Sequence, residues 1–145
     1  VAATQRPLLD GLMTLMKYMG LIRNSKQTTQ AIDFDGIKTG KIHPSDIDAV
    51  LEFDNKALIL IEVKRKGNDL PLGQRMLLER IVDKWEVGIV LKVEHQCYDT
   101  DVDIPLKDCI VTGVYYKGKW NSYNDNLKDT LNRIGKTFSI NKLKI

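Results

Sequence analysis

The spacing of apolar residues predicts a helix near the start of the chain. Between Leu8 and Ile22, apolar side chains recur at intervals of three and four residues, which places them on one helix face. Pro7 stands where such a helix can begin, and Gly20 stands near where it can end. We therefore expect an amphipathic helix over this stretch.

Two apolar runs in the middle of the chain predict a β-hairpin. Asp48–Phe53 and Ala57–Lys64 are rich in Val, Ile, Leu and Phe, which favour strands. Asp54-Asn55-Lys56 between them has the composition of a tight turn. Residues 23–45, before the hairpin, are polar and rich in turn formers, so we expect a loop there with a weak strand at Ala31–Phe34.

The residues after the hairpin predict a crossover. Apolar side chains from Pro71 to Trp85 share one helical stripe, and Val87–Val93 is an apolar run of strand length. A strand that returns after a helix lies parallel to the strand before that helix. The pattern therefore predicts a βαβ unit.

The C-terminal third predicts a second hairpin and a last helix. The hairpin strands would be Cys109–Tyr116 and Lys119–Tyr123, and the helix Asp125–Ile134. The whole order predicts an α/β fold with a central mixed β-sheet flanked by helices. The length of 145 residues suits a single domain over residues 1–145.

Composition narrows the class of protein. Hydrophobic residues make up 43% and charged residues 28%, which is typical of a globular domain. No apolar run approaches the roughly 20 residues that span a bilayer, and no secretory signal pattern is present, so we expect no membrane partner and a cytoplasmic location. Cys97 and Cys109 have no partner cluster for zinc, and we expect both to be reduced.

The net charge of +3 is unevenly distributed along the chain. Residues 1–30 sum to +3 and residues 115–145 to +5, so the middle of the chain sums to −5. Basic flanks around an acidic centre suit a protein that attracts a polyanion while it holds a divalent cation. Lysines that solvate surface helices produce the same pattern, so charge alone leaves both interpretations open.

The predicted hairpin brings three charged residues to one end. If its turn has three residues, Asp48 stands opposite Glu62, with Cβ atoms about 5 Å apart. Lys64 points to the same face as Glu62 because side chains alternate along a strand. Two carboxylates so close repel each other unless a cation lies between them, and Mg²⁺ accepts oxygen ligands. A four-residue turn would shift the register and send Asp48 to the other face. The alternative interpretation is that Asp48 and Lys64 are polar strand ends and that Glu62 is an exposed residue or half of a cross-strand pair.

These residues carry a family resemblance. Asp48-Ala49-Val50-Leu51-Glu52-Phe53, followed after a turn by Ile59-Leu60-Ile61-Glu62-Val63-Lys64, resembles the PD-(D/E)xK, or restriction-endonuclease-like, nuclease superfamily. Gly73-Gln74-Arg75-Met76-Leu77-Leu78 is similar to the glutamine-bearing helix of VRR-NUC and RecB-like members, and small Holliday-junction-resolvase-type members have a comparable size. The resemblance covers residues 42–93 and implies an αβββαβ core.

The resemblance also implies a set of site residues. Asp48 and Glu62 would ligate Mg²⁺ together with the carbonyl oxygen of Val63, and Mn²⁺ would substitute for Mg²⁺. Lys64 would orient or help to deprotonate the attacking water, and Gln74 would position the phosphate or that water. These roles describe metal-dependent phosphodiester hydrolysis.

The choice of acidic residues that would ligate the metal is open at two points. The Pro-Asp pair of the family is absent, since Pro44 is followed by Ser45 and Asp46, so Asp46 is an alternative to Asp48. Many relatives also carry an acidic residue on the first helix, and Asp10 is the acid available there.

Other residues have lesser roles in this reading. Arg65, Lys66 and Arg75 lie beside the motif and are candidates for phosphate contacts. The segment Tyr115–Trp120 interleaves aromatics with lysines, which suits stacking on unpaired bases, although strand packing is the favoured interpretation. His43 and His95 have no partner at motif spacing, and we expect a loop residue and a strand-end residue.

The function we expect from the sequence is structure-selective endonuclease activity on DNA, for example on branched or single-stranded regions. Cleavage of a junction would favour a homodimer, because two strands must be cut in matched geometry. The alternatives are a catalytically inactive nucleic-acid-binding module with the same fold, and a protein-interaction domain that uses the N-terminal helix. The inactive module predicts salt-sensitive binding that needs no metal.

Overall fold

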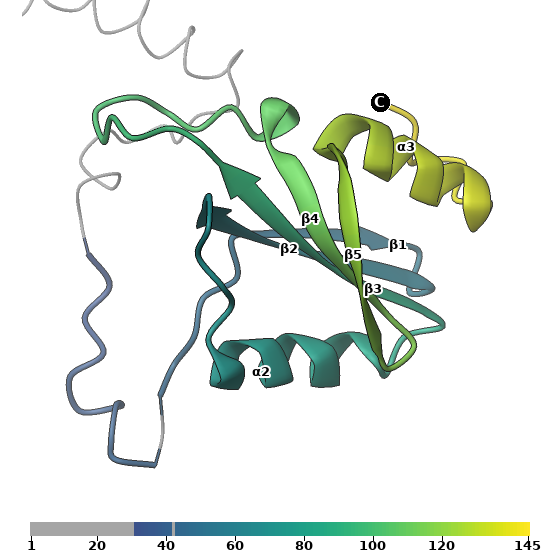
Figure 1. The fold of residues 1–145 in the computed structure, drawn as a ribbon. Coiled ribbons are helices and arrows are strands. Elements are labelled where there is room, and N and C mark those ends of the chain that lie inside the picture. Colours follow the sequence, from purple (N-terminus) through teal and green to yellow (C-terminus); the bar gives the residue numbers. More distant parts are fainter. Residues whose placement is uncertain (1–30, 42) are drawn as a thin grey trace, which may run out of the picture. The chain divides into compact units, whose positions relative to one another are not determined.

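The computed structural model describes residues 31–41 and 43–145 (Figure 1). The chain divides into two compact units, residues 1–44 and Ser45–Ile145. The helix predicted between Leu8 and Ile22 lies outside the described residues. The single domain expected over residues 1–145 stays a prediction.

The strand predicted at Ala31–Phe34 is wrong, because these residues form no strand. The backbone N–H of Asp35 donates to Asp33 Oδ1 at 2.8 Å, and Ile37 N donates to the Phe34 carbonyl at 3.0 Å. Gly36 has a φ of +82°, which only glycine adopts readily. These local hydrogen bonds close a turn and replace strand pairing.

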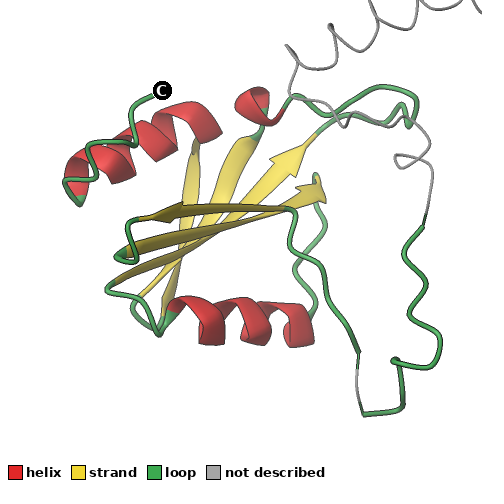
Figure 2. Ribbon diagram, turned by 180° about the vertical axis from the view of Figure 1, so that it is seen from behind, coloured by secondary structure: helices red, strands yellow, loops and turns green. Residues whose placement is uncertain are grey.

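The second unit contains a five-stranded sheet and two α-helices. The elements are β1 (Ala49–Phe53), β2 (Ala57–Arg65), α2 (Leu72–Val82), β3 (Val87–His95), the 3₁₀ turn η2 (Leu106–Asp108), β4 (Ile110–Tyr116), β5 (Lys119–Asn126) and α3 (Leu127–Thr137). The strands lie in the order β1-β2-β3-β4-β5; β2 and β3 are parallel, and the other neighbours are antiparallel. The predicted α/β fold with a central mixed sheet flanked by helices is confirmed, since α2 and α3 cover opposite faces (Figures 1 and 2).

The described residues supply the part β1-β2-α2-β3 of the expected αβββαβ core. The first helix and first strand of that core would precede β1, and residues 31–41 and 43–48 contain neither. The predicted crossover is confirmed, because Ala57 pairs with Val87 and the parallel pairing continues to the ends of both strands. The hairpin of β4 and β5 is confirmed as well.

The turn of the first hairpin has three residues. Phe53 pairs with Ala57, and Lys56 N donates to the Phe53 carbonyl at 3.0 Å. Asp54 and Asn55 adopt φ angles of 53° and 59°, a region that Asp and Asn tolerate better than other side chains. The predicted register is therefore confirmed.

Alternation along β2 and β3 divides the core into two layers. On the α3 side, the buried side chains of the two strands are Ile59, Ile61, Ile89, Leu91 and Val93. On the α2 side, Leu58, Leu60 and Val90 pack against Leu78 and Val82. The next residues on the α2 side of β2 are Glu62 and Lys64, so charge replaces the apolar layer near the carboxyl end of the strand.

Tyr115 and Trp120 pack against α2, as the favoured interpretation of strand packing predicted. Tyr115 is buried, and its hydroxyl donates to Asp83 Oδ1 at 2.8 Å. Trp120 Nε1 donates to Glu79 Oε1 at 2.6 Å. Both aromatic rings therefore belong to the interface between sheet and helix.

Burial raises the pKa of Tyr115 to about 12, and the hydrogen bond to Asp83 adds to the effect. The ordinary tyrosine pKa of 10 applies to the unfolded chain, so between pH 10 and pH 12 the unfolded state loses this proton first. We expect the stability that Tyr115 contributes to fall as the pH rises through this range, and Tyr115→Phe to lack this fall. Urea unfolding midpoints from pH 8 to pH 11 test the difference, with Tyr98→Phe as an exposed control that keeps the wild-type slope.

None of the helices in residues 31–41 and 43–145 is long and apolar enough to cross a membrane.

Candidate active site

Asp48 lies at the entrance to the first hairpin. The last β1–β2 pair is Ala49 with Ile61, so Asp48 extends the register to a position opposite Glu62. Asp48 Oδ2 accepts a hydrogen bond from the backbone N–H of Val63 at 2.7 Å. Because the N–H and C=O of one strand residue point to the same side, the Val63 carbonyl faces the edge where Asp48 lies.

Glu62 has a buried carboxylate, and its two oxygens have different surroundings. The residue is 3% exposed. Its Oε1 accepts from Lys64 Nζ at 2.9 Å and from Gln74 Nε2 at 2.6 Å. Its Oε2 is buried and accepts no hydrogen bond from the described residues. Burying a carboxylate oxygen without a hydrogen-bond donor or a cation costs free energy. This cost makes Oε2 a candidate ligand for a metal ion.

Lys64 and Gln74 reach Glu62 from different elements. Lys64 projects from the same face of β2 and partly offsets the negative charge. Gln74 comes from the first turn of α2, whose N-terminal end carries a partial positive charge. Gln74 therefore reaches the motif from α2, and its catalytic role stays a prediction.

A second charged row lies on β3 beside the first. Lys92 pairs with Glu62, and Glu94 pairs with Lys64, across the parallel strands. Lys92 Nζ lies 3.1 Å from Asp69 Oδ1 and 3.9 Å from Glu94 Oε2. Glu94 Oε1 also accepts from the backbone N–H of Gly67 at 2.6 Å.

Several groups set the ionisation of Glu94. Burial by itself raises its pKa, but the Thr112 hydroxyl, the Gly67 N–H and the Lys92 ammonium outweigh burial and hold the pKa below its ordinary value. The carboxylate is therefore ionised at neutral pH.

Sequence reasoning missed Lys92 and Glu94. The signal available was the interruption of the apolar run of β3 by charges at alternate positions, which is the pattern that singled out Glu62 and Lys64 on β2. Only the parallel pairing shows that the two charged rows lie side by side.

The oxygen groups at Glu62 are of the chemical kind that Mg²⁺ binds. Within residues 31–41 and 43–145, no three Asp, Glu, His or Cys side chains converge as a metal cluster. Mg²⁺ does not require such a cluster, because it keeps several waters and binds through one or two carboxylates. Asp48 and Glu62 would supply two carboxylates, and the Val63 carbonyl would supply a further oxygen. A cation at the Oε2 atom of Glu62 would offset the charge of a buried oxygen that has no hydrogen-bond donor among the described residues.

The structure separates the alternative acids. Both carboxylates are exposed, but Asp48 accepts a hydrogen bond from the Val63 N–H of β2, whereas Asp46 lies two residues earlier in the chain. This arrangement favours Asp48 as the partner of Glu62. Asp10 lies outside the described residues.

The two histidines have the positions expected from the sequence. His43 is an exposed loop residue of the first unit. His95 is the last residue of β3, and its Nδ1 accepts from the backbone N–H of Cys97 at 3.1 Å. Cys97 and Cys109 are both free thiols, as predicted.

The three basic candidates have different surroundings. Arg65 and Lys66 are exposed at the end of β2, directly after Lys64, and the Arg65 guanidinium lies 5.4 Å from the centre of the Tyr98 ring. Arg75 Nε lies 3.1 Å from Glu79 Oε1 in an ion pair along α2. Their contact with phosphate stays a prediction.

Comparison with protein-family models, curated proteins and solved structures gave no match.

Proposed function

We propose that this protein is a Mg²⁺-dependent phosphodiesterase that cleaves DNA, with its active centre at Asp48, Glu62 and Lys64. The observation that carries the proposal is the state of Glu62. One oxygen of its buried carboxylate is held by Lys64 and Gln74, and the other has no hydrogen-bond donor among the described residues. A carboxylate of this kind beside Asp48 suits a divalent cation better than it suits a structural ion pair.

Asp48, Glu62 and the Val63 carbonyl would hold the metal. When bound, Mg²⁺ would polarise the scissile phosphate and lower the pKa of a water molecule. The Asp48 carboxylate is oriented by the Val63 N–H, which leaves its other oxygen for this role. The buried position of Glu62 keeps its carboxylate in one orientation.

The protein groups around the metal ligands would handle water and charge. Lys64 Nζ, 2.9 Å from Glu62, carries a positive charge that would orient the attacking water and offset the charge that develops on the phosphate. Gln74 donates to Glu62 through its amide nitrogen, and its amide oxygen would accept a hydrogen bond from that water.

The substrate would be bound mainly through its backbone. Arg65 and Lys66 extend from the end of β2 and would contact phosphates beside the cleaved bond. Such contacts carry no sequence information, so selection would come from the structure of the DNA. A structure-selective endonuclease fits this expectation, and a homodimer would act on two strands of a junction.

The test is incubation of the full chain with single-stranded, duplex, flapped and four-way-junction DNA, in Mg²⁺, in Mn²⁺ and in EDTA. We expect cleavage of at least one substrate with either metal and none in EDTA. Binding that falls steeply with salt but needs no metal, without cleavage, would instead support the inactive binding module. The absence of both cleavage and binding would support the protein-interaction domain.

The variant Lys64→Gln tests the role of the lysine charge. We expect single-turnover cleavage to slow by about 100-fold, because the charge beside the reacting groups is lost. We expect Mn²⁺ still to raise the unfolding temperature, because Asp48 and Glu62 remain. Lys84→Gln is the matched control, since Lys84 is exposed beyond the end of α2. Equal cleavage rates in the two variants would exclude a catalytic role for Lys64.

A further inference from the structure

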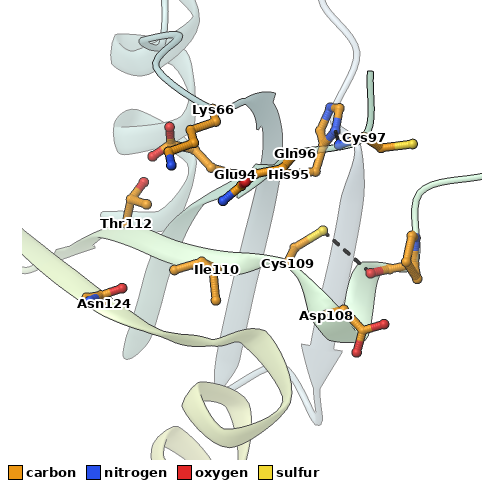
Figure 3. Close-up of a pocket in the computed structure, with 11 residues that line it drawn as sticks. Lys66, Glu94, His95, Gln96, Cys97, Asp108, Cys109, Ile110, Thr112 and Asn124 are labelled. Atoms are coloured by element: carbon orange, nitrogen blue, oxygen red, sulfur yellow. Dashed lines mark hydrogen bonds between the residues drawn. The ribbon is translucent and has the colours of Figure 1, made fainter. Parts of the chain in front are cut away.

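A pocket lies beside the candidate active site, between the end of β3 and the strands β4 and β5 (Figure 3). Its volume is about 440 Å³. β3 contributes Glu94 and His95, β4 contributes Ile110 and Thr112, and β5 contributes Asn124. The pocket belongs to the same compact unit as Glu62 and Lys64.

The walls of the pocket combine apolar surface with groups that both donate and accept hydrogen bonds. Ile110 and Pro105 supply apolar surface. Gln96 and Asn124 each supply a carboxamide. A carboxamide presents a donor and an acceptor side by side, which matches the edge of a nucleobase. Apolar walls with a few polar groups are typical of sites for small ring systems.

Backbone pairing fixes the pocket relative to the candidate active site. Glu94, on the pocket wall, pairs with Lys64 across the parallel strands. The backbone N–H of Lys66 donates to the His95 carbonyl at 2.9 Å, so the ends of β2 and β3 are joined beyond the motif. Neighbouring strands lie about 4.8 Å apart and residues rise about 3.3 Å along a strand, so Glu94, one strand across and two residues further along, lies roughly 8 Å from Glu62.

The pocket edge also has a cation for the backbone. Lys66 is exposed, lines the pocket and stands two residues after Lys64. A phosphate held by Lys66 would lie at the rim of the pocket, two residues along the chain from Lys64, so one strand of DNA would reach from the pocket to the candidate active site.

We propose that this pocket binds the base of an unpaired nucleotide in the DNA strand that passes the candidate active site. The inference rests on the proposed function and adds a substrate class to it. A base inside a duplex is stacked on both faces and paired along its edge, so it cannot enter a concave pocket unless it leaves the helix. The preferred substrate is therefore DNA with a single-stranded segment close to the cleaved bond.

The test measures binding in EDTA, where no metal-dependent cleavage occurs. A fluorescent single-stranded oligonucleotide is compared by anisotropy with an abasic oligomer of the same length and the same number of phosphates. The two carry equal charge, so the contribution of the phosphate backbone is the same for both. We expect the full chain to bind the oligonucleotide with bases about 10-fold more tightly.

Two variants assign this preference to the pocket. Asn124→Leu and Gln96→Leu each remove one carboxamide, and we expect both to reduce the preference for bases without changing the affinity for duplex DNA. Asn121→Leu is the matched control, because Asn121 is exposed on β5 and pairs with Val114, away from the pocket. Measuring both carboxamide variants guards against a fold defect in one of them.

Three results would overturn the proposal: no binding of either oligomer, equal affinity of the full chain for both oligomers, or an unchanged preference in both variants. Failure of the proposed function has a different signature. If the protein prefers bases in EDTA but cleaves nothing with Mg²⁺, the pocket proposal stands and the proposed nuclease function fails. If the protein cleaves DNA without preferring bases, the nuclease function stands and the pocket proposal fails.

Discussion

Glu62→Gln is expected to reduce metal-dependent DNA cleavage by about 1,000-fold while the protein remains folded. Loss of a residue that only supports a metal ligand costs about 10-fold to 100-fold, and Glu62 would be a ligand itself. The glutamine has the same shape as the glutamate, and its amide oxygen can still accept from Lys64 and Gln74, as Oε1 does. The change removes the negative charge and turns the Oε2 position into an N–H donor, which repels a cation.

Two measurements separate a lost metal site from a lost fold. Single-turnover cleavage reports the chemistry, and thermal unfolding with and without Mn²⁺ reports metal binding to the folded state. For Glu62→Gln we expect an unfolding temperature in EDTA at least equal to that of the wild type, and no further rise with Mn²⁺. The first expectation follows because a neutral amide costs less to bury than a carboxylate with one unpartnered oxygen.

Glu86→Gln is the matched control for charge. Glu86 is exposed and precedes Val87, which pairs with Ala57 at the opposite end of the parallel strands. We expect wild-type cleavage from this variant. If Glu62→Gln cleaved as fast as Glu86→Gln, Glu62 would not be a metal ligand and the proposed active centre would be wrong.

Gly88→Ala is expected to destabilise the fold by about 3 kcal/mol or more, at the upper end of the cost of overpacking a core. Gly88 is buried on β3 below the end of α2. A Cβ atom built there would lie 1.9 Å from the carbonyl oxygen of Val82 and 2.6 Å from its carbonyl carbon. Both atoms belong to the helix backbone, so no side-chain rotation relieves the clash, and α2 must move away from the sheet.

Urea unfolding gives the free energy, and thermal unfolding should show a decrease of roughly 10 °C in the midpoint. Gly73→Ala is the control. Gly73 lies in α2, the helix that Gly88→Ala would displace, and a Cβ atom at Gly73 meets nothing within 4 Å. Alanine favours a helix over glycine by up to about 1 kcal/mol, so this control should be as stable as the wild type or slightly more stable. A Gly88→Ala variant within about 0.5 kcal/mol of the wild type would mean that α2 does not pack this closely on β3.

The pattern of residues was sufficient for most of the regular elements. Two apolar runs rich in strand-forming residues predicted the hairpin of β1 and β2, and the change to a helical period predicted α2. The sequence was misleading at Ala31–Phe34, where β-favouring side chains are present but local hydrogen bonds to Asp33 Oδ1 and the Phe34 carbonyl close a turn. A short strand forms only when another strand pairs with it, and the β-propensities of its own residues do not show whether such a strand is present.

The sequence by itself determined which residues could share a face. Side chains two apart on a strand point the same way, so Glu62 and Lys64 were together in any model of β2, and a three-residue turn was enough to place Asp48 opposite Glu62. These relations are local, because they depend on strand geometry and on one turn.

Only the tertiary structure decided what surrounds these residues. The burial of Glu62, its bond to Gln74 and the neighbouring row of Lys92 and Glu94 depend on how α2 crosses the sheet and on the register of β3 against β2. The pocket at the start of β4 likewise needs strands that are distant in sequence. Contacts of this kind are set by the packing of the whole core, because a helix and two strands must fit together before any of their side chains meet.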